Sequence, residues 1–130
     1  MNAKEVNARK EIDADGIGVI YIDGMIIPSL GATKVDVHAK EILAEMDTPR
    51  IILNLTGVSY LDSFCFGWIM RTFREIKDKG GDFGLCCPNE DIRYLLEITD
   101  FSRVVPVYNS ENDAKEAVRT GNQSKRIVYI

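Results

Sequence analysis

The residues best suited to chemistry form one short cluster, Asp62, Ser63 and Cys65, which directly follows an apolar run. A carboxylate, a hydroxyl and a thiol this close together suit either a modification site or a reactive thiol. The chain has a single histidine, His38, and its three cysteines show no regular spacing. A histidine-based triad, a metal site and a disulfide framework are therefore not expected. This cluster does not look like a catalytic centre, so we expect it to present a side chain rather than to carry out an enzyme reaction, with no cofactor or metal.

Cys65 supports one alternative, a redox-sensing thiol protein. A thiol in the first turn of a helix can have its pKa lowered by the helix dipole, which creates a reactive thiolate. No second cysteine stands at C-x-x-C spacing from Cys65, and the single histidine gives little chance of a nearby base. The interpretation of Cys65 as a small buried hydrophobic residue is therefore favoured.

Ser63 stands where a strand is expected to give way to a helix. Residues 51–55 form an apolar run of strand length, and Thr56-Gly57 is expected to be a turn. Between residues 66 and 76 the apolar positions recur at helical spacing. Serine at a helix start commonly acts as an N-cap worth ~1 kcal/mol. Ser63 is therefore interpreted as a cap, as a presented regulatory hydroxyl, or as both.

Phe64 and Trp68 suggest a further alternative. The two aromatic residues are four apart and share one face of the expected helix. If they are exposed, they form an apolar patch for a protein partner, including a second copy of this chain as a homodimer. If they pack beneath the helix, they belong to the core. In the exposed case the protein is an interaction or scaffold module that needs no phosphorylation.

The spacing of apolar residues along the chain predicts the element order ββαβαβαβα. Gly24 is expected at a bulge, and Gly80-Gly81 at the end of the central helix. Asn89 or Asp91 and then Ser110 are expected to cap the last two helices. The expected strands are 5–12, 17–27, 51–55, 83–87 and 104–108, and the expected helices are 30–46, 63–79, about 89–98 and 110–118.

Alternating strands and helices predict an α/β sandwich with a mostly parallel sheet of four to five strands, an antiparallel edge strand and about four helices. Residues 1–120 are expected to form a single domain, and residues 121–130 a C-terminal tail. Functional sites in open parallel sheets gather beyond the C-terminal ends of the strands. Asp62 and Ser63 are expected to lie there.

Charge and hydropathy narrow the possible partners. The net charge is −4 over 130 residues, and binding to nucleic acid would call for a basic face. The apolar runs are shorter than the ~20 residues that span a bilayer, and the N-terminus lacks the apolar core of a signal peptide. We therefore expect a cytoplasmic protein that binds neither nucleic acid nor membrane.

At three places the sequence resembles the STAS domain of bacterial anti-sigma factor antagonists: IILNLTGVSYLDSFCFG at 51–67, IRYLLEITDF at 92–101 and VVPVYNSENDA at 104–114. The family shows an apolar strand, then Asp-Ser-Ser-Gly-Leu-Gly, then a helix closed by glycines. The resemblance covers residues 17–118. The chain departs from the pattern at Phe64-Cys65-Phe66, at Ile27, where the family has an acidic residue, and at 98–101.

The resemblance implies a phosphorylation switch. In such proteins a partner anti-sigma factor serine kinase phosphorylates the serine that corresponds to Ser63, and a cognate phosphatase resets it. The unphosphorylated form binds the kinase, which then releases its sigma factor. The partner-binding residues are expected to be Asp62, Phe64, Cys65, Gly67 and Trp68.

Overall fold

The computed structural model describes residues 7–26 and 31–121, except for the side chains of residues 25, 26, 31–34 and 63. The elements follow the order ββαβαβαβα, with a short 3₁₀ helix before the last strand. They are β1 Asn7–Ile12, β2 Gly18–Ile26, α1 Gly31–Glu45, β3 Arg50–Leu61, α2 Ser63–Asp78, β4 Asp82–Cys86, α3 Glu90–Ile98, η1 Phe101–Arg103, β5 Val107–Tyr108 and α4 Glu111–Thr120.

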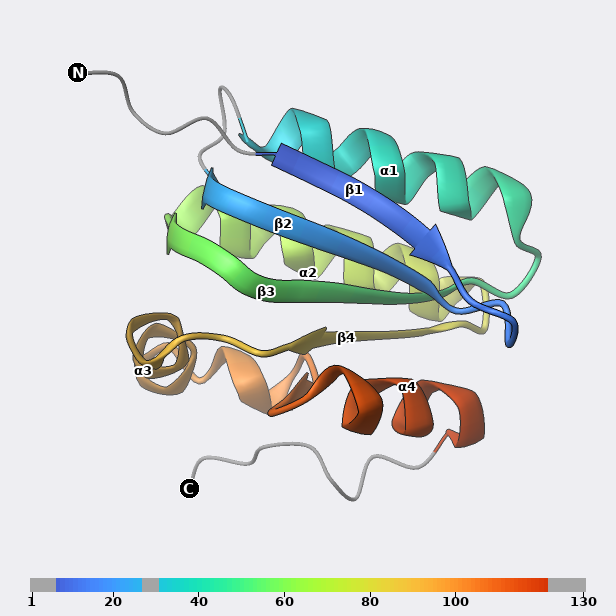
Figure 1. Cartoon of the computed structure of the whole chain (residues 1–130). Helices are drawn as coiled ribbons and strands as arrows, with labels where there is room; N and C mark the ends of the chain where they lie inside the picture. Colours follow the sequence, from blue (N-terminus) through green and yellow to red (C-terminus); the bar gives the residue numbers. More distant parts are fainter. Residues whose placement is uncertain (1–6, 27–30, 122–130) are drawn as a thin grey trace.

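One five-stranded sheet organises the molecule, with the strands in the order β1-β2-β3-β4-β5 (Figure 1). β1 pairs antiparallel with β2, and each of the other neighbouring pairs is parallel. The predicted fold class is confirmed, including the antiparallel edge strand. The expected single domain of residues 1–120 stays a prediction, and the tail from residue 122 onward lies outside the described residues.

The central strand is longer than its sequence suggests, and the predicted turn at Thr56-Gly57 is wrong. β3 continues to Leu61 through a bulge, because Tyr21 of β2 pairs with Asn54 whereas Asp23 pairs with Gly57. The Asn54 side-chain oxygen accepts hydrogen bonds from the Thr56 backbone N–H at 3.0 Å and from its hydroxyl at 2.6 Å. Asn54 thus supports the extra residue locally, and the chain bends without leaving the sheet.

The two faces of the sheet are covered differently. The helices α1 and α2 pack on one face, and α4 packs on the other (Figure 1). Alternation along β3 explains this, because Ile51, Leu53 and Leu55 join the α1–α2 core while Ile52 points toward α4. The cluster on the α4 side is smaller and consists of Ile17, Val19, Ile52, Cys86, Tyr108, Ala114, Ala117 and Val118.

Several local predictions about element ends are confirmed. The side chains of Asn89 and Ser110 accept hydrogen bonds from backbone N–H groups in the first turns of α3 and α4. Gly80 has a left-handed φ of 76° directly after Lys79, the C-cap of α2, and Gly24 lies at a register shift with a φ of 109°.

The last predicted strand is wrong in extent, because only Val107 and Tyr108 pair with β4. Residues 104–106 form a turn and irregular structure instead, after η1, which follows Asp100 with its left-handed φ of 55°.

Candidate functional site

The predicted site lies at the C-terminal end of β3, where the chain turns directly into α2. Asp62 is the N-cap of this helix: its backbone is extended, and its carboxylate accepts a hydrogen bond from the Cys65 N–H at 3.1 Å. Ser63 is the first helical residue, so the interpretation of Ser63 as the N-cap is wrong. The Ser63 side chain lies outside the described residues, as does Ile27.

Contacts with α3 and η1 hold the junction between β3 and α2 in place. The Asn89 side-chain amide donates to the Val58 carbonyl oxygen at 3.0 Å, while its oxygen caps α3. The rings of Phe66 and Phe101 lie 5.0 Å apart between α2 and η1. These contacts hold the start of α2 against η1 and α3, so the residues of its first turn have a fixed position.

Two of the predicted partner-binding residues face solvent. The Phe64 side chain is 73% exposed in the first turn of α2, and Gly67 is exposed one turn later. Asp62 is half-buried between them and the end of β3. We call Asp62, Phe64 and Gly67 the junction surface. Tyr60, two residues before Asp62, is also exposed and adds a second aromatic ring to this end of the sheet.

The other two predicted contact residues lie inside the protein. Trp68 is only 8% exposed, because α1 packs beside α2 and its Asp36 carboxylate accepts the indole N–H at 3.0 Å. Of the two alternatives for the aromatic pair, the exposed patch of Phe64 with Trp68 is therefore wrong, because Trp68 belongs to the core. Cys65 is 1% exposed, and burial raises the pKa of its thiol to about 12. A neutral buried thiol does not match the reactive thiolate that a redox sensor needs.

Two exposed residues on α3 were not predicted from the sequence. Tyr94 and Ile98 are 61% and 56% exposed, and they stand four residues apart on one helix face. Their spacing could have identified them as a pair, but it could not separate a buried face from an exposed one. The buried face of α3 carries Ile92 and Leu96 instead.

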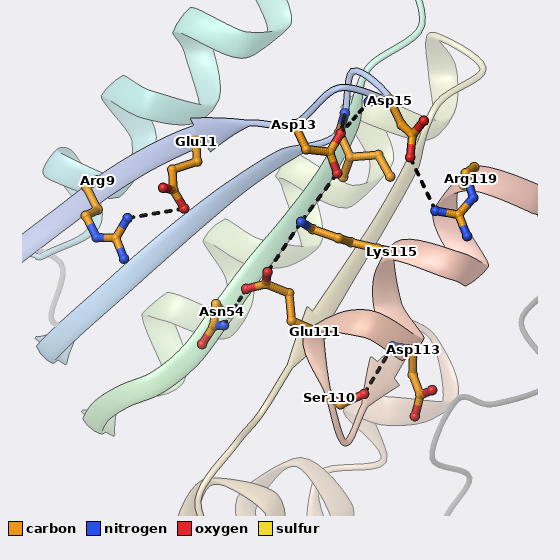
Figure 2. A network of polar contacts seen from close by, with 11 residues as sticks. Arg9, Glu11, Asp13, Asp15, Asn54, Ser110, Glu111, Asp113, Lys115 and Arg119 are labelled. Atoms are coloured by element: carbon orange, nitrogen blue, oxygen red, sulfur yellow. Dashed lines mark hydrogen bonds and ion pairs between the residues drawn. The ribbon is translucent and has the colours of Figure 1, made fainter.

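A polar network joins α4 to the other face of the sheet (Figure 2). The Glu111 carboxylate accepts from the Asn54 amide at 2.9 Å and faces Lys115 at 3.5 Å. Lys115 also pairs with Asp13 in the β1–β2 turn at 3.4 Å. Desolvation opposes ionisation of Glu111, yet hydrogen bonds from Asn54 and Tyr21, with Lys115 nearby, hold its pKa below the usual value. The network fastens α4 to the sheet.

The described part of the chain carries neither a metal site nor a membrane span. No group of three or more His, Cys, Asp and Glu side chains there is arranged to hold a metal ion. None of the helices described has the length and apolar character needed to cross a membrane.

Comparison with known proteins gives a consistent result. The family model of the STAS domain matches residues 11–114. A Thermotoga maritima protein named "Putative anti-sigma factor antagonist" is 37% identical over 70 residues, which cover 54% of this chain and 62% of that protein. The "Anti-sigma F factor antagonist" of Paenibacillus polymyxa is 27% identical over 74 residues, which cover 57% of this chain and 63% of that protein. The chain thus spans less than two thirds of the length of both relatives.

Solved structures show the same fold. The anti-sigma factor antagonist SpoIIAA in its unphosphorylated form superposes with a TM-score of 0.69 at 20% identity, covering 88% of this chain and 97% of that chain. Its phosphorylated form gives a TM-score of 0.60 at 20% identity, with coverages of 86% and 99%.

Proposed function

The chain belongs to the STAS domain family, and on this premise we propose that it is an anti-sigma factor antagonist that docks on its partner through the junction surface. The partner is an anti-sigma factor serine kinase, and the encounter takes place in the cytoplasm. The observation that carries the proposal is the exposure of Phe64, 73% in the first turn of α2 and directly after Ser63.

Phe64 provides the apolar anchor that a protein partner requires. Full burial of a phenylalanine side chain contributes about 1.5–3 kcal/mol, and aromatic anchors at the centre of an interface often dominate its affinity. Gly67, one turn further on, presents no side chain and leaves room for close approach of a partner. Because the capped start of α2 fixes the backbone at Phe64, little backbone entropy is lost on docking.

We propose that phosphorylation of Ser63 prevents docking. A phosphoryl group adds about two negative charges. Here they would stand beside the Asp62 carboxylate, which already occupies the Cys65 N–H at the helix start. Like-charge repulsion and the cost of desolvation next to Phe64 would then weaken binding by several kcal/mol, or a few decades of affinity. SpoIIAA, which shares this fold, has been solved in both forms, so in that protein the fold accommodates the modification.

Mass spectrometry of the intact protein tests the switch. After incubation with ATP and lysate of the organism that encodes the chain, we expect one phosphoryl adduct. Ser63→Ala should abolish it, and a cognate phosphatase in the lysate should remove it once ATP is exhausted. Ser59→Ala, at an exposed serine in β3, is the matched control and should retain the adduct. No adduct on the wild-type chain, or an adduct that persists on Ser63→Ala, contradicts the proposal.

Calorimetric titration against the purified kinase tests docking separately. Phe64→Ala should weaken binding about tenfold or more, because the variant loses its apolar anchor. Tyr94→Ala removes a similarly exposed ring from α3 and should bind as the wild type does. Equal affinities for wild type and Phe64→Ala would show that the junction surface is not part of the interface.

The exposure of Phe64 also supports a second candidate function, an interaction module that works without phosphorylation. In that case a partner binds through Phe64, and neither Ser63→Ala nor ATP changes the affinity. Binding that depends on Phe64, together with an unmodified Ser63, would favour this second function over the switch.

A further inference from the structure

A groove of about 290 Å³ lies between α1 and α2, the two helices that pack on one face of the sheet (Figure 1). This volume lies just below the ~300–1,000 Å³ typical of small-molecule sites, so the groove suits a single side chain better than a whole ligand. Along α2 the groove begins at Trp68, next to Gly67 of the junction surface. Its lining includes Asp36 and Lys40 from α1 and Trp68, Arg71, Thr72 and Glu75 from α2.

Of the four charged side chains that line the groove, three already have partners. The Asp36 carboxylate accepts the Trp68 indole N–H at 3.0 Å, and the Glu75 carboxylate pairs with Lys40 at 3.7 Å. Glu75 stands four residues from Arg71, the usual spacing of a helical ion pair, but it pairs across to α1 instead. Among the residues that the structure describes, none forms an ion pair or a hydrogen bond with the Arg71 guanidinium. The available charge of the groove is therefore positive.

The Arg71 guanidinium lies over Gly67, one turn closer to the start of α2. A Cβ added to Gly67 would stand 3.9 Å from the guanidinium nitrogen Nη1, and it would meet no other atom within 4 Å. Because glycine has no side chain, nothing at position 67 covers the guanidinium, and both residues are exposed. The hydrogen-bond donors of Arg71 thus lie beside the junction surface and open to solvent.

Phe64, Gly67 and Arg71 form one stripe along α2. Their spacing of three and then four residues places them on the same side of the helix, and all three are exposed. A partner that docks on the junction surface therefore also meets Arg71. Burying the guanidinium in such an interface without an acceptor would cost free energy, so the partner must supply an acceptor at this point.

We propose that this groove takes an acidic side chain of the docking partner, with its carboxylate on Arg71. The inference rests on the proposed function, because the partner is the same anti-sigma factor serine kinase. A planar guanidinium binds a carboxylate through two parallel hydrogen bonds, and such charge-assisted bonds are stronger than neutral ones. Lys40 in the same groove adds a second positive charge. A basic side chain fits poorly, because Asp36 and Glu75 already have partners and Arg71 would repel it.

Calorimetric titration against the kinase, purified from the lysate by its phosphorylation of Ser63, tests the charge of the groove. ADP in place of ATP keeps Ser63 unmodified. Arg71→Gln should weaken binding about tenfold or more and make the affinity depend less on salt concentration, because an ion pair is lost. Arg74→Gln removes the same charge from an exposed position outside the groove and should bind as the wild type does. Glu75→Gln should bind at least as tightly as the wild type, since it removes a negative charge from the groove.

Carbodiimide coupling identifies the occupant directly, because it joins an amine to a carboxylate in contact with it. In the Arg71→Lys variant we expect a cross-link from position 71 to an aspartate or glutamate of the kinase, read by peptide mass spectrometry, and Arg74→Lys should give none. A circular dichroism melt of each variant checks that it is folded.

The outcomes separate this inference from the proposed function. Full affinity of Arg71→Gln together with weak binding of Phe64→Ala would overturn the groove proposal and leave the junction surface intact. Binding that Glu75→Gln weakens and Arg71→Gln does not would assign the groove to a basic side chain instead. A wild-type chain that does not bind the kinase at all would overturn both proposals.

Discussion

Cys65 is a residue for which burial outweighs the helix dipole. Its position in the first turn of α2 favours a thiolate, but the side chain is 1% exposed and its pKa rises to about 12. The same turn presents Phe64 to solvent, because neighbouring helix positions point in different directions. One turn thus holds a protected thiol and an exposed aromatic ring side by side.

We predict that Cys65 in the folded protein resists alkylation at neutral pH. Cys87, which is half-buried, should react first, and Cys65 should react only after denaturation. Peptide mass spectrometry after timed treatment with iodoacetamide gives the order of labelling. Rapid, selective labelling of Cys65 would restore the redox-sensor interpretation.

Glu111 makes the free energy of unfolding depend on pH in the acidic range. Its pKa in the folded protein lies below the usual 4.5, so the unfolded chain takes up the proton first as the pH falls. The stabilisation is therefore present above about pH 4.5 and is lost as the pH falls through the folded-state pKa.

We predict that Glu111→Gln lowers the free energy of unfolding by about 1–3 kcal/mol at neutral pH, since charge-assisted hydrogen bonds are lost. The difference from the wild type should shrink as the pH falls below about 4.5. Urea unfolding at a series of pH values measures it. Glu97→Gln, at an exposed carboxylate on α3, is the control and should show a small difference at every pH. A Glu111→Gln deficit that grows in acid would contradict the assignment.

Two glycines of α2 and its C-terminal end lie in opposite surroundings. Gly67 lies inside the helix and is exposed, and a Cβ there would meet only the Arg71 guanidinium nitrogen at 3.9 Å. Gly81 lies just after the helix, where a Cβ would overlap the Pro49 carbonyl oxygen. The first glycine is thus free of packing constraints, whereas the second is required by close backbone approach.

We predict opposite outcomes for alanine at these two glycines. Gly67→Ala should stabilise the protein by about 0.5–1 kcal/mol, because alanine favours the helix, and it should weaken docking of the partner by adding bulk to the junction surface. Gly81→Ala should destabilise it by several kcal/mol through the clash. Thermal melts and partner titrations measure the two effects. A Gly67→Ala variant that is both more stable and equally tightly bound would show that the partner does not approach this turn.

At the scale of the whole molecule, most buried apolar residues form one cluster that joins α1, α2, α3 and four of the strands. Trp68, the single tryptophan, lies in that cluster and reaches α1 through its hydrogen bond to Asp36. Its fluorescence therefore reports on the contact between two helices and the sheet at once.

We predict that Trp68 fluorescence and far-ultraviolet circular dichroism give coincident urea transitions. A shared core makes the unfolding of these elements cooperative, and the indole emission should shift to longer wavelength as Trp68 enters water. If the fluorescence transition came at clearly lower urea than the loss of helix, α1 and α2 would separate before the sheet unfolds.

The sequence by itself determined the features that rest on local chemistry. The order of strands and helices follows from the spacing of apolar residues, and the caps at Asn89 and Ser110 follow from side chains that reach their own backbone. The start of α2 at Ser63 followed from the change to helical spacing. These interactions join residues that are close in sequence, so the residue types alone identify them.

Tertiary structure alone decided which of those residues a partner can reach. Phe64 and Trp68 stand four residues apart on α2, yet only Phe64 is exposed. Trp68 is buried, and its indole N–H donates to the Asp36 carboxylate of α1, 32 positions earlier in the chain. The continuation of β3 through Thr56 and Gly57 likewise depends on pairing with β2. Each of these outcomes depends on a neighbour distant in sequence, and the spacing of residues does not encode that neighbour's position.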